Sequence, residues 1–338
     1  HPTSPVRRSF LVLVAAMGLS ALAAELVWVR ILVLHLGSRV YAFALLLGVY
    51  LLGIAIGSLA IRALAGRISD PARALARTQI LVAVALVVQL LALGFAGDLI
   101  AWLSGALTLR ASFAALQSVF FAAVVVLFMP VTVLFGASFP LAVAADPTPR
   151  SPGQHAGAVA TANTLGAIIG AVGAPFVLVP LIGCQHTLLS LAILHLIVAL
   201  ALWRTRTTAL VATVALTMVV LFGLILPRDW VLRRAVEDIS DTQVLVALEE
   251  DIGATIIVKE YGPPDARWLS LELNGTNVAG SSRALLKVQQ LQGHLPLLQV
   301  EDPREILHVG FGSGGTCWAV SHHPVERIDV VEISPRVL

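Results

Sequence analysis

The sequence predicts an all-α polytopic membrane domain, followed by a small β-hairpin unit and the first β-α-β of a Rossmann-like α/β domain of the methyltransferase type. Two observations indicate this division. Only 12% of the residues are charged, about half the share of a soluble domain, and 58% are hydrophobic. The charges are also unevenly distributed, because residues 1–226 carry 16 of the 42 charged side chains and residues 227–338 carry 26. This composition excludes a single soluble enzyme, a disordered chain and a simple nucleic-acid-binding protein.

The first segment, residues 1–226, is expected to be a multi-span domain. A helix needs about 20 apolar residues to cross a hydrocarbon core of about 30 Å. Asp98–Arg110 is too short to cross alone and is expected to be an interfacial or re-entrant piece. The seven predicted spans are Phe10–Val29, Tyr41–Ile61, Gln79–Ala96, Ala114–Phe135, Ala156–Ile182, Thr187–Trp203 and Ala209–Leu226.

Small and polar residues inside the spans are expected to join helices. Gly53 and Gly57 are four residues apart, as are Gly166 and Gly170, and this spacing lets helix backbones approach closely in lipid. Four further polar residues are expected to form interhelical hydrogen bonds, namely Gln89, Gln117, Asn163 and His195.

Glu25, near the end of the first span, has two interpretations. It lies at the membrane interface with Trp28 as an aromatic anchor, or it reaches another helix or a wet cavity. The loop 62–78 carries four arginines and is therefore predicted to be cytoplasmic. Seven spans from that side would place residue 227 onward outside the cell. This conflicts with a soluble half that needs a cytoplasmic cofactor.

Residues 227–281 are expected to form a linker and a small antiparallel β unit. Asn274-Gly275 is typical of a type I′ turn between two strands, Trp268–Leu273 and Thr276–Ala279. Two strands precede them and a helix follows, at Val244–Leu248, Ala254–Glu260 and Ser282–Leu298.

Residues 282–338 contain the most specific pattern, in which a glycine-rich turn joins a short strand to a helix. Glu332 lies 22 residues after Gly310, at the end of the next predicted strand, where an acid can accept hydrogen bonds from ribose hydroxyls. This arrangement predicts a nucleoside-containing cofactor. Its spacing fits both a dinucleotide and S-adenosylmethionine. The elements are a strand at Glu305–Val309, a helix at Thr316–His322 and a strand at Ile328–Val331, and the candidate binding residues are Gly310, Gly312, Ser313, Gly314 and Glu332.

Several segments resemble the polyamine aminopropyltransferase (spermidine synthase) family. They are Gly293–Leu297 (GHLPL), Arg304–Pro335 (REILHVGFGSGGTCWAVSHHPVERIDVVEISP) and the Leu273–Gly275 turn. Two membrane segments, Glu25–Arg30 (ELVWVR) and Asn163–Ala167 (NTLGA), resemble the bacterial multi-pass proteins described as fused transporter-like/spermidine synthase proteins. The resemblance implies a bacterial inner-membrane location.

The resemblance implies decarboxylated S-adenosylmethionine, or S-adenosylmethionine, as donor and an amine as acceptor. The glycines would line the donor and Glu332 would hold its ribose. The family's Tyr-His pair at the amine site is replaced here by Val288 and Gln289. The family's catalytic aspartate is expected beyond Leu338, so we expect the sequence to be part of a longer chain and assign no catalytic residue. Two alternative functions fit the same sequence: a non-catalytic transporter or scaffold that senses a nucleoside, and a methyltransferase acting on a membrane-associated substrate. The sequence is also compatible with an oligomer.

No metal site is expected. Cys184 and Cys317 lie far apart, and His322-His323 has no third ligand nearby. The two histidines are expected to cap or solvate the end of the preceding helix. Glu301 and Asp302 are expected to be solvated turn residues.

Overall fold

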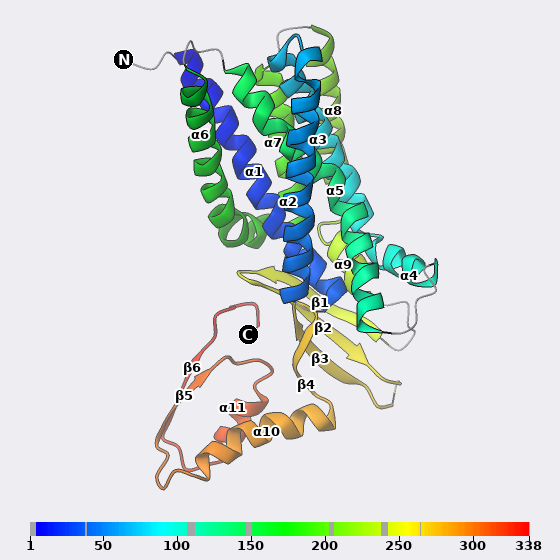
Figure 1. Ribbon diagram of the computed structural model, residues 1–338. Coiled ribbons are helices and arrows are strands. Elements are labelled where there is room, and N and C mark those ends of the chain that lie inside the picture. The colour runs from blue at the N-terminus through cyan, green and yellow to red at the C-terminus, as the bar shows by residue number, and fades with distance from the viewer. Residues whose placement is uncertain are drawn as a thin grey trace. The chain divides into compact units, whose positions relative to one another are not determined.

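The computed structural model describes residues 5–37, 39–106, 112–146, 151–202, 206–237, 243–263 and 265–337. They pack as two compact units, His1–Ala235 and Val236–Leu338. The first unit is helical, and the second carries the strands (Figure 1). The first unit extends past residue 226, because a short helix that follows the last long one, α9 (Trp230–Val236), packs on it.

The first unit contains long apolar helices joined by short connections. Its elements are α1 (Pro5–Leu36), α2 (Arg39–Leu64), η1 (Ala65–Arg67), α3 (Pro71–Leu93), α4 (Ala96–Ala106), α5 (Phe113–Ala145), α6 (Pro152–Gly173), the π-helix η2 (Ala174–Leu178), α7 (Val179–Leu202), α8 (Arg206–Ile225) and α9. The α4 helix has 11 residues, or about 16 Å at 1.5 Å per residue, which is too short to cross a membrane. The predicted interfacial piece extends to Arg110, which lies outside the described residues.

Among the described residues, five helical runs are long and apolar enough to cross a membrane. A bent pair, Leu210–Ile225 with Trp230–Val236, makes a sixth if its 54° bend lies within one span. The predicted fifth and sixth spans lie in the single run Gly153–Leu202, which has a non-helical residue at Gly183 (φ 80°, ψ 166°). Length and hydropathy therefore support a membrane unit without establishing seven spans.

The predicted loop 62–78 is wrong at both ends. Arg62 lies in the last turn of α2, and Arg73 and Arg77 lie in α3. Asp70 caps α3 by accepting the Arg73 backbone N–H at 3.0 Å, and Pro71 occupies the first turn. These two residues start the helix well before the apolar run at Gln79.

Glycines let two pairs of helices come into close contact, as predicted. A Cβ atom on Gly57 of α2 would overlap the Val133 carbonyl of α5. On α6, Cβ atoms at Gly166 and Gly170 would overlap the backbone carbonyls of Ala15 and Leu19 in α1. The α1–α6 and α2–α5 pairs are thus packed backbone to backbone.

A buried polar network joins α1, α3, α5 and α7. The two nitrogens of His195 lie 2.7 Å from Gln79 Oε1 and 2.8 Å from Ser20 Oγ. Because Oε1 only accepts, Nδ1 carries the proton and Nε2 accepts from Ser20. Gln79 Nε2 then donates to Ser138 Oγ at 3.0 Å, and Ser138 donates to the Leu134 carbonyl at 2.9 Å. The imidazole is therefore held as the neutral Nδ1–H tautomer.

Of the four predicted interhelical polar residues, His195 and Gln89 have confirmed roles. Gln89 Nε2 of α3 donates to the Leu127 carbonyl of α5 at 3.0 Å. Asn163 of α6 lies against Gly18 of α1, and Gln117 is half-buried.

The interfacial interpretation of Glu25 and Trp28 is wrong. The Trp28 side chain is fully buried, because its ring packs against Phe128 and Phe135 of α5 at centroid distances of 5.3 and 6.1 Å. Glu25 is only 7% exposed, and Tyr50 of α2 lies close enough to interact with it electrostatically. The carboxyl group thus faces the protein interior.

The second unit contains two sheets. The strands β1 (Gln243–Asp251), β2 (Ala254–Tyr261), β3 (Trp268–Leu273) and β4 (Thr276–Gly280) form an antiparallel sheet in sequence order. Helix α10 (Arg283–Leu297) follows. Then β5 (Glu305–Val309) pairs in parallel with β6 (Arg327–Val331), with the short helix α11 (Gly315–Val320) between them in sequence. The predicted type I′ turn is confirmed, because Asn274 (φ 54°) and Gly275 (φ 75°) both have positive φ.

Gly166→Ala is expected to destabilise the helical unit by about 1–3 kcal/mol, because the added Cβ would overlap the Ala15 carbonyl. Gly157→Ala is the matched control on the same helix, since nothing lies within 4 Å of a Cβ there. The control is expected to be neutral or up to about 1 kcal/mol more stable. Thermal unfolding in detergent, followed by circular dichroism, measures both, and equal unfolding temperatures would contradict the packing argument.

His195→Leu is expected to cost about 1–3 kcal/mol of stability, because it leaves the Gln79 oxygen and the Ser20 hydroxyl buried without a partner. Thr217→Val provides the control, since the exposed Thr217 hydroxyl bonds only within its own helix. Denaturant unfolding in micelles gives the difference. A His195→Leu protein as stable as the wild type would show that the network carries no stability.

Candidate functional site

The loop between β5 and α11 has a backbone that only glycine adopts easily. Gly310, Gly312 and Gly314 have φ angles of 83°, 58° and 75°, in the left-handed region. The Gly310 N–H donates to the Val331 carbonyl at 2.8 Å and so extends the pairing of β5 with β6. The predicted glycine-rich turn is therefore present between two parallel strands.

Glu332, directly after β6, is bound to this loop. Its Oε2 accepts the Phe311 backbone N–H at 2.7 Å, and its Oε1 accepts the Ser334 N–H at 3.0 Å. The pKa of Glu332 is below its usual value, mainly because the carboxylate accepts the Ser334 N–H. Partial burial acts in the opposite direction and raises the pKa, whereas N–H groups of the glycine loop lower it further. The carboxylate is therefore ionised and faces backbone N–H groups on both sides, those of the glycine loop and those that follow β6.

Gln289 of α10 ties the glycine loop to the first sheet, a role that the sequence did not indicate. Its Oε1 accepts the Ser313 hydroxyl. Its Nε2 donates to the Gly280 carbonyl at the end of β4 at 2.9 Å, and to the Leu285 carbonyl at 3.1 Å. The residue that replaces the family's imidazole is therefore only 6% exposed and fully engaged.

Two hollows flank the loop, one on the side of α10 and α11 and one on the side of the first sheet. The first holds about 420 Å³ and is lined by Leu286, Gln290, Ser313, Gly314, Gly315 and Trp318. The second holds about 380 Å³, and its lining includes Val258, Leu269, Leu271, Gly312 and Ser313. Both volumes are in the range of small-molecule sites. Of the five predicted binding residues, Gly312, Ser313 and Gly314 line a hollow. Gly310 and Glu332 line neither, and Glu332 instead bonds to the backbone of the loop.

A buried acid lies behind the second hollow. Glu272 of β3 is 7% exposed; it accepts the Tyr261 hydroxyl at 3.0 Å and lies 3.6 Å from Lys259 Nζ. Ser270, which lines the hollow, donates to the same carboxylate at 3.4 Å and accepts from Asn277. The charge and hydrogen bonds of Glu272 are thus satisfied within the sheet, which indicates that this acid supports the wall of the hollow. The pattern of alternating strands did not identify this cluster.

The remaining candidate residues have structural partners. His322 Nδ1 donates to the Trp318 carbonyl at 2.8 Å, so it caps α11 as expected, whereas His323 Nε2 bonds instead to His294 Nδ1 at 2.9 Å. Cys184 and Cys317 form no disulfide within the described part of the chain. Asp302 is exposed and pairs with Arg304. Within the described ranges, no three His, Cys, Asp or Glu residues lie close enough together to hold a metal ion.

The chain was also compared with known proteins. No protein-family model, curated protein or solved structure matches it. The chemistry of the site is therefore inferred from its geometry, and the resemblance to the aminopropyltransferases stays a prediction.

The Glu332 contacts predict a pH dependence of stability. Because the pKa of Glu332 is lowered in the folded protein, its contribution is fully present above the ordinary Glu value of about 4.3 and is lost as the pH falls through the lowered value. Wild type should therefore lose more stability than Glu332→Gln between about pH 5 and pH 3. Thermal unfolding over a pH series measures this. Parallel pH profiles would contradict the assignment.

Proposed function

We propose that this chain is a membrane-anchored, spermidine-synthase-like transferase that binds decarboxylated S-adenosylmethionine or S-adenosylmethionine. The observation that carries the proposal is the left-handed glycine loop between parallel strands, with an ionised carboxylate hydrogen-bonded to it at the end of the second strand. This is the arrangement expected at the start of a Rossmann-like domain. The hollows beside the loop provide space for the ligand.

The residues of the loop have distinct proposed roles. Gly312 and Gly314 have no side chain between the backbone and the ligand, so an adenosyl group can approach closely. The ionised Glu332 would accept the ribose hydroxyls, and Ser313 would contact the ligand from the wall that both hollows share.

In the proposed reaction, the acceptor nitrogen bonds to the aminopropyl carbon as the bond from that carbon to the sulfonium sulfur breaks. A neutral thioether leaves, and the new amine loses a proton. No base for that proton is assigned among the described residues.

The proposed membrane arrangement has seven crossings in the bacterial inner membrane. The run Gly153–Leu202 has 50 residues, or about 75 Å at 1.5 Å per residue, more than twice a hydrocarbon core of about 30 Å. The break at Gly183 divides it into two crossings, and α8 supplies the last one. The donor implies that the second unit is cytoplasmic. Arginine counts place the start of the chain on the same side, from which seven crossings would end outside the cell.

One observation favours a second candidate, a non-catalytic transporter or scaffold whose second unit senses a nucleoside. Gln289 occupies the position of the family's amine-site imidazole. Both ends of its amide bond to the protein, to the Gly280 carbonyl and to the Ser313 hydroxyl of the loop, instead of facing an amine. Such a protein would bind the nucleoside without turnover. A methyltransferase would need only the same donor site.

Calorimetric titration of the chain with each nucleoside tests the donor site. Glu332→Gln is expected to weaken binding about 10- to 100-fold, because hydrogen bonds to a charged group contribute about 1.5–3 kcal/mol. Glu326→Gln is the control, since that exposed acid pairs with Arg304 away from the loop. Absence of heat with both nucleosides, or equal affinities of the two variants, would overturn the proposed site.

Product mass separates the candidate functions once binding is found. Incubation with the donor and a diamine is expected to add an aminopropyl group to the amine. Addition of a methyl group would indicate a methyltransferase, and binding with no product would favour the sensing transporter or scaffold.

A further inference from the structure

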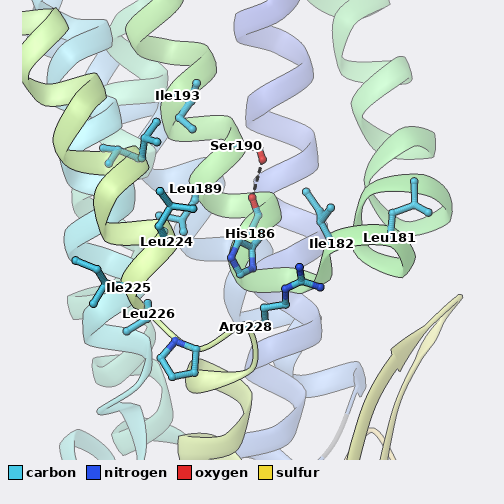
Figure 2. A pocket seen from close by; sticks show the side chains of 14 residues that line it. Leu181, Ile182, His186, Leu189, Ser190, Ile193, Leu224, Ile225, Leu226 and Arg228 are labelled. Atoms are coloured by element: carbon cyan, nitrogen blue, oxygen red, sulfur yellow. Dashed lines mark hydrogen bonds between the residues drawn. The ribbon is translucent and has the colours of Figure 1, made fainter.

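A groove in the helical unit lies between α7 and α8. It has a volume of about 690 Å³, and most of its walls are aliphatic. Figure 2 shows Leu189 and Ile193 of α7 facing Leu224 of α8 across it. Gly223 lies in the α8 wall, where the nearest atom to a Cβ would be the Leu189 side chain. Leu189 thus packs closely against α8 at Gly223, where any added side chain would crowd this wall of the groove.

One end of the groove is cationic and polar. Arg228, which follows α8, and His186 of α7 lie together at that end, while Ile193 lies at the other (Figure 2). No ion pair or hydrogen bond reaches the Arg228 guanidinium within the part of the chain that the structure describes, and Asp229 is turned to Arg233 at 2.7 Å. Among the described residues that line the groove, none is acidic. The polar end is therefore positively charged and uncommitted.

His186 is also available to a ligand. Its Nδ1 has no hydrogen-bond partner among the described residues. The Ser190 hydroxyl bonds to the backbone carbonyl of His186 at 2.7 Å, which leaves the imidazole itself uninvolved. An imidazole N–H and a guanidinium at one end of an apolar groove are donors suited to a phosphate.

We infer that the α7–α8 groove binds one anionic phospholipid, with its phosphate at Arg228 and His186 and an acyl chain between α7 and α8. Two features of the groove match the two parts of such a lipid. From His186 to Ile193 the α7 wall is about two helical turns, or about 10 Å, long. Beyond His186 it is apolar except for Ser190, whose hydroxyl bonds to the His186 carbonyl. Arg228 lies just past the end of the apolar helix α8, so it would meet the headgroups if α8 crosses the membrane by itself as proposed above.

The test is native mass spectrometry of the full chain in neutral detergent, titrated with phosphatidylglycerol, phosphatidylcholine or inorganic phosphate. We expect phosphatidylglycerol to bind more tightly than phosphatidylcholine. Arg228→Gln is expected to weaken phosphatidylglycerol binding about tenfold, as for loss of a charge-assisted hydrogen bond. Arg67→Gln, which removes an equal charge from an exposed residue in η1, is the control and should not change it.

Gly223→Leu tests the acyl-chain part separately, because it fills the groove and keeps both polar residues. It is expected to abolish phosphatidylglycerol binding. Equal binding of the two lipids, or an unchanged affinity in Arg228→Gln, would show that the groove binds lipid without selecting its headgroup, as the surface of any membrane helix does. Either result would overturn the inference. Inorganic phosphate that competes for the site, with phosphatidylglycerol binding retained in Gly223→Leu, would identify a free-anion site and overturn it as well. Arg228 is exposed, so its variant keeps the inference testable if Gly223→Leu does not fold.

Discussion

Inside an apolar helical unit, a polar group can find a partner only within the protein, and this constraint organises the first unit. The hydrogen bonds of His195 satisfy it through side chains from four helices. Each donor in that network meets one acceptor, so the imidazole serves as a neutral cross-link. Gln89 meets the same requirement by bonding to a backbone carbonyl. The close glycine contacts join other pairs, α1 with α6 and α2 with α5, so they attach the neighbouring helices to this network's helices.

In the second unit, the corresponding constraint is the supply of hydrogen-bond partners for the backbone of the partly buried glycine loop. A loop with three left-handed glycines has backbone N–H groups that no regular element satisfies. Glu332 accepts one at Phe311, and Gln289 holds the neighbouring Ser313 hydroxyl. The loop is thereby held in shape from two directions. A ligand would find a loop that is already shaped, which lowers the ordering cost of binding.

Patterns that depend on neighbouring residues were predictable from the sequence. The Asn274-Gly275 turn, the strands on either side of it and the helix capped by Ser282 all follow from local geometry. The glycine loop is as expected for the same reason, because positive φ angles demand glycine. Partnerships across the fold were not predictable. Gln79 appeared only as the first residue of a span, and no local signal shows that its amide faces His195 and Ser138.

Trp28 illustrates the same limit. A tryptophan near the end of an apolar run is typical of a membrane interface, yet the length of α1 beyond the predicted span places this ring inside the bundle. The sequence by itself determined the division into an apolar and a polar part, the hairpin and the glycine loop, because composition and backbone sterics act locally. Only the tertiary structure decided which polar side chains meet, where Glu332 bonds and that α7 and α8 leave a groove, because those depend on residues far apart in the chain.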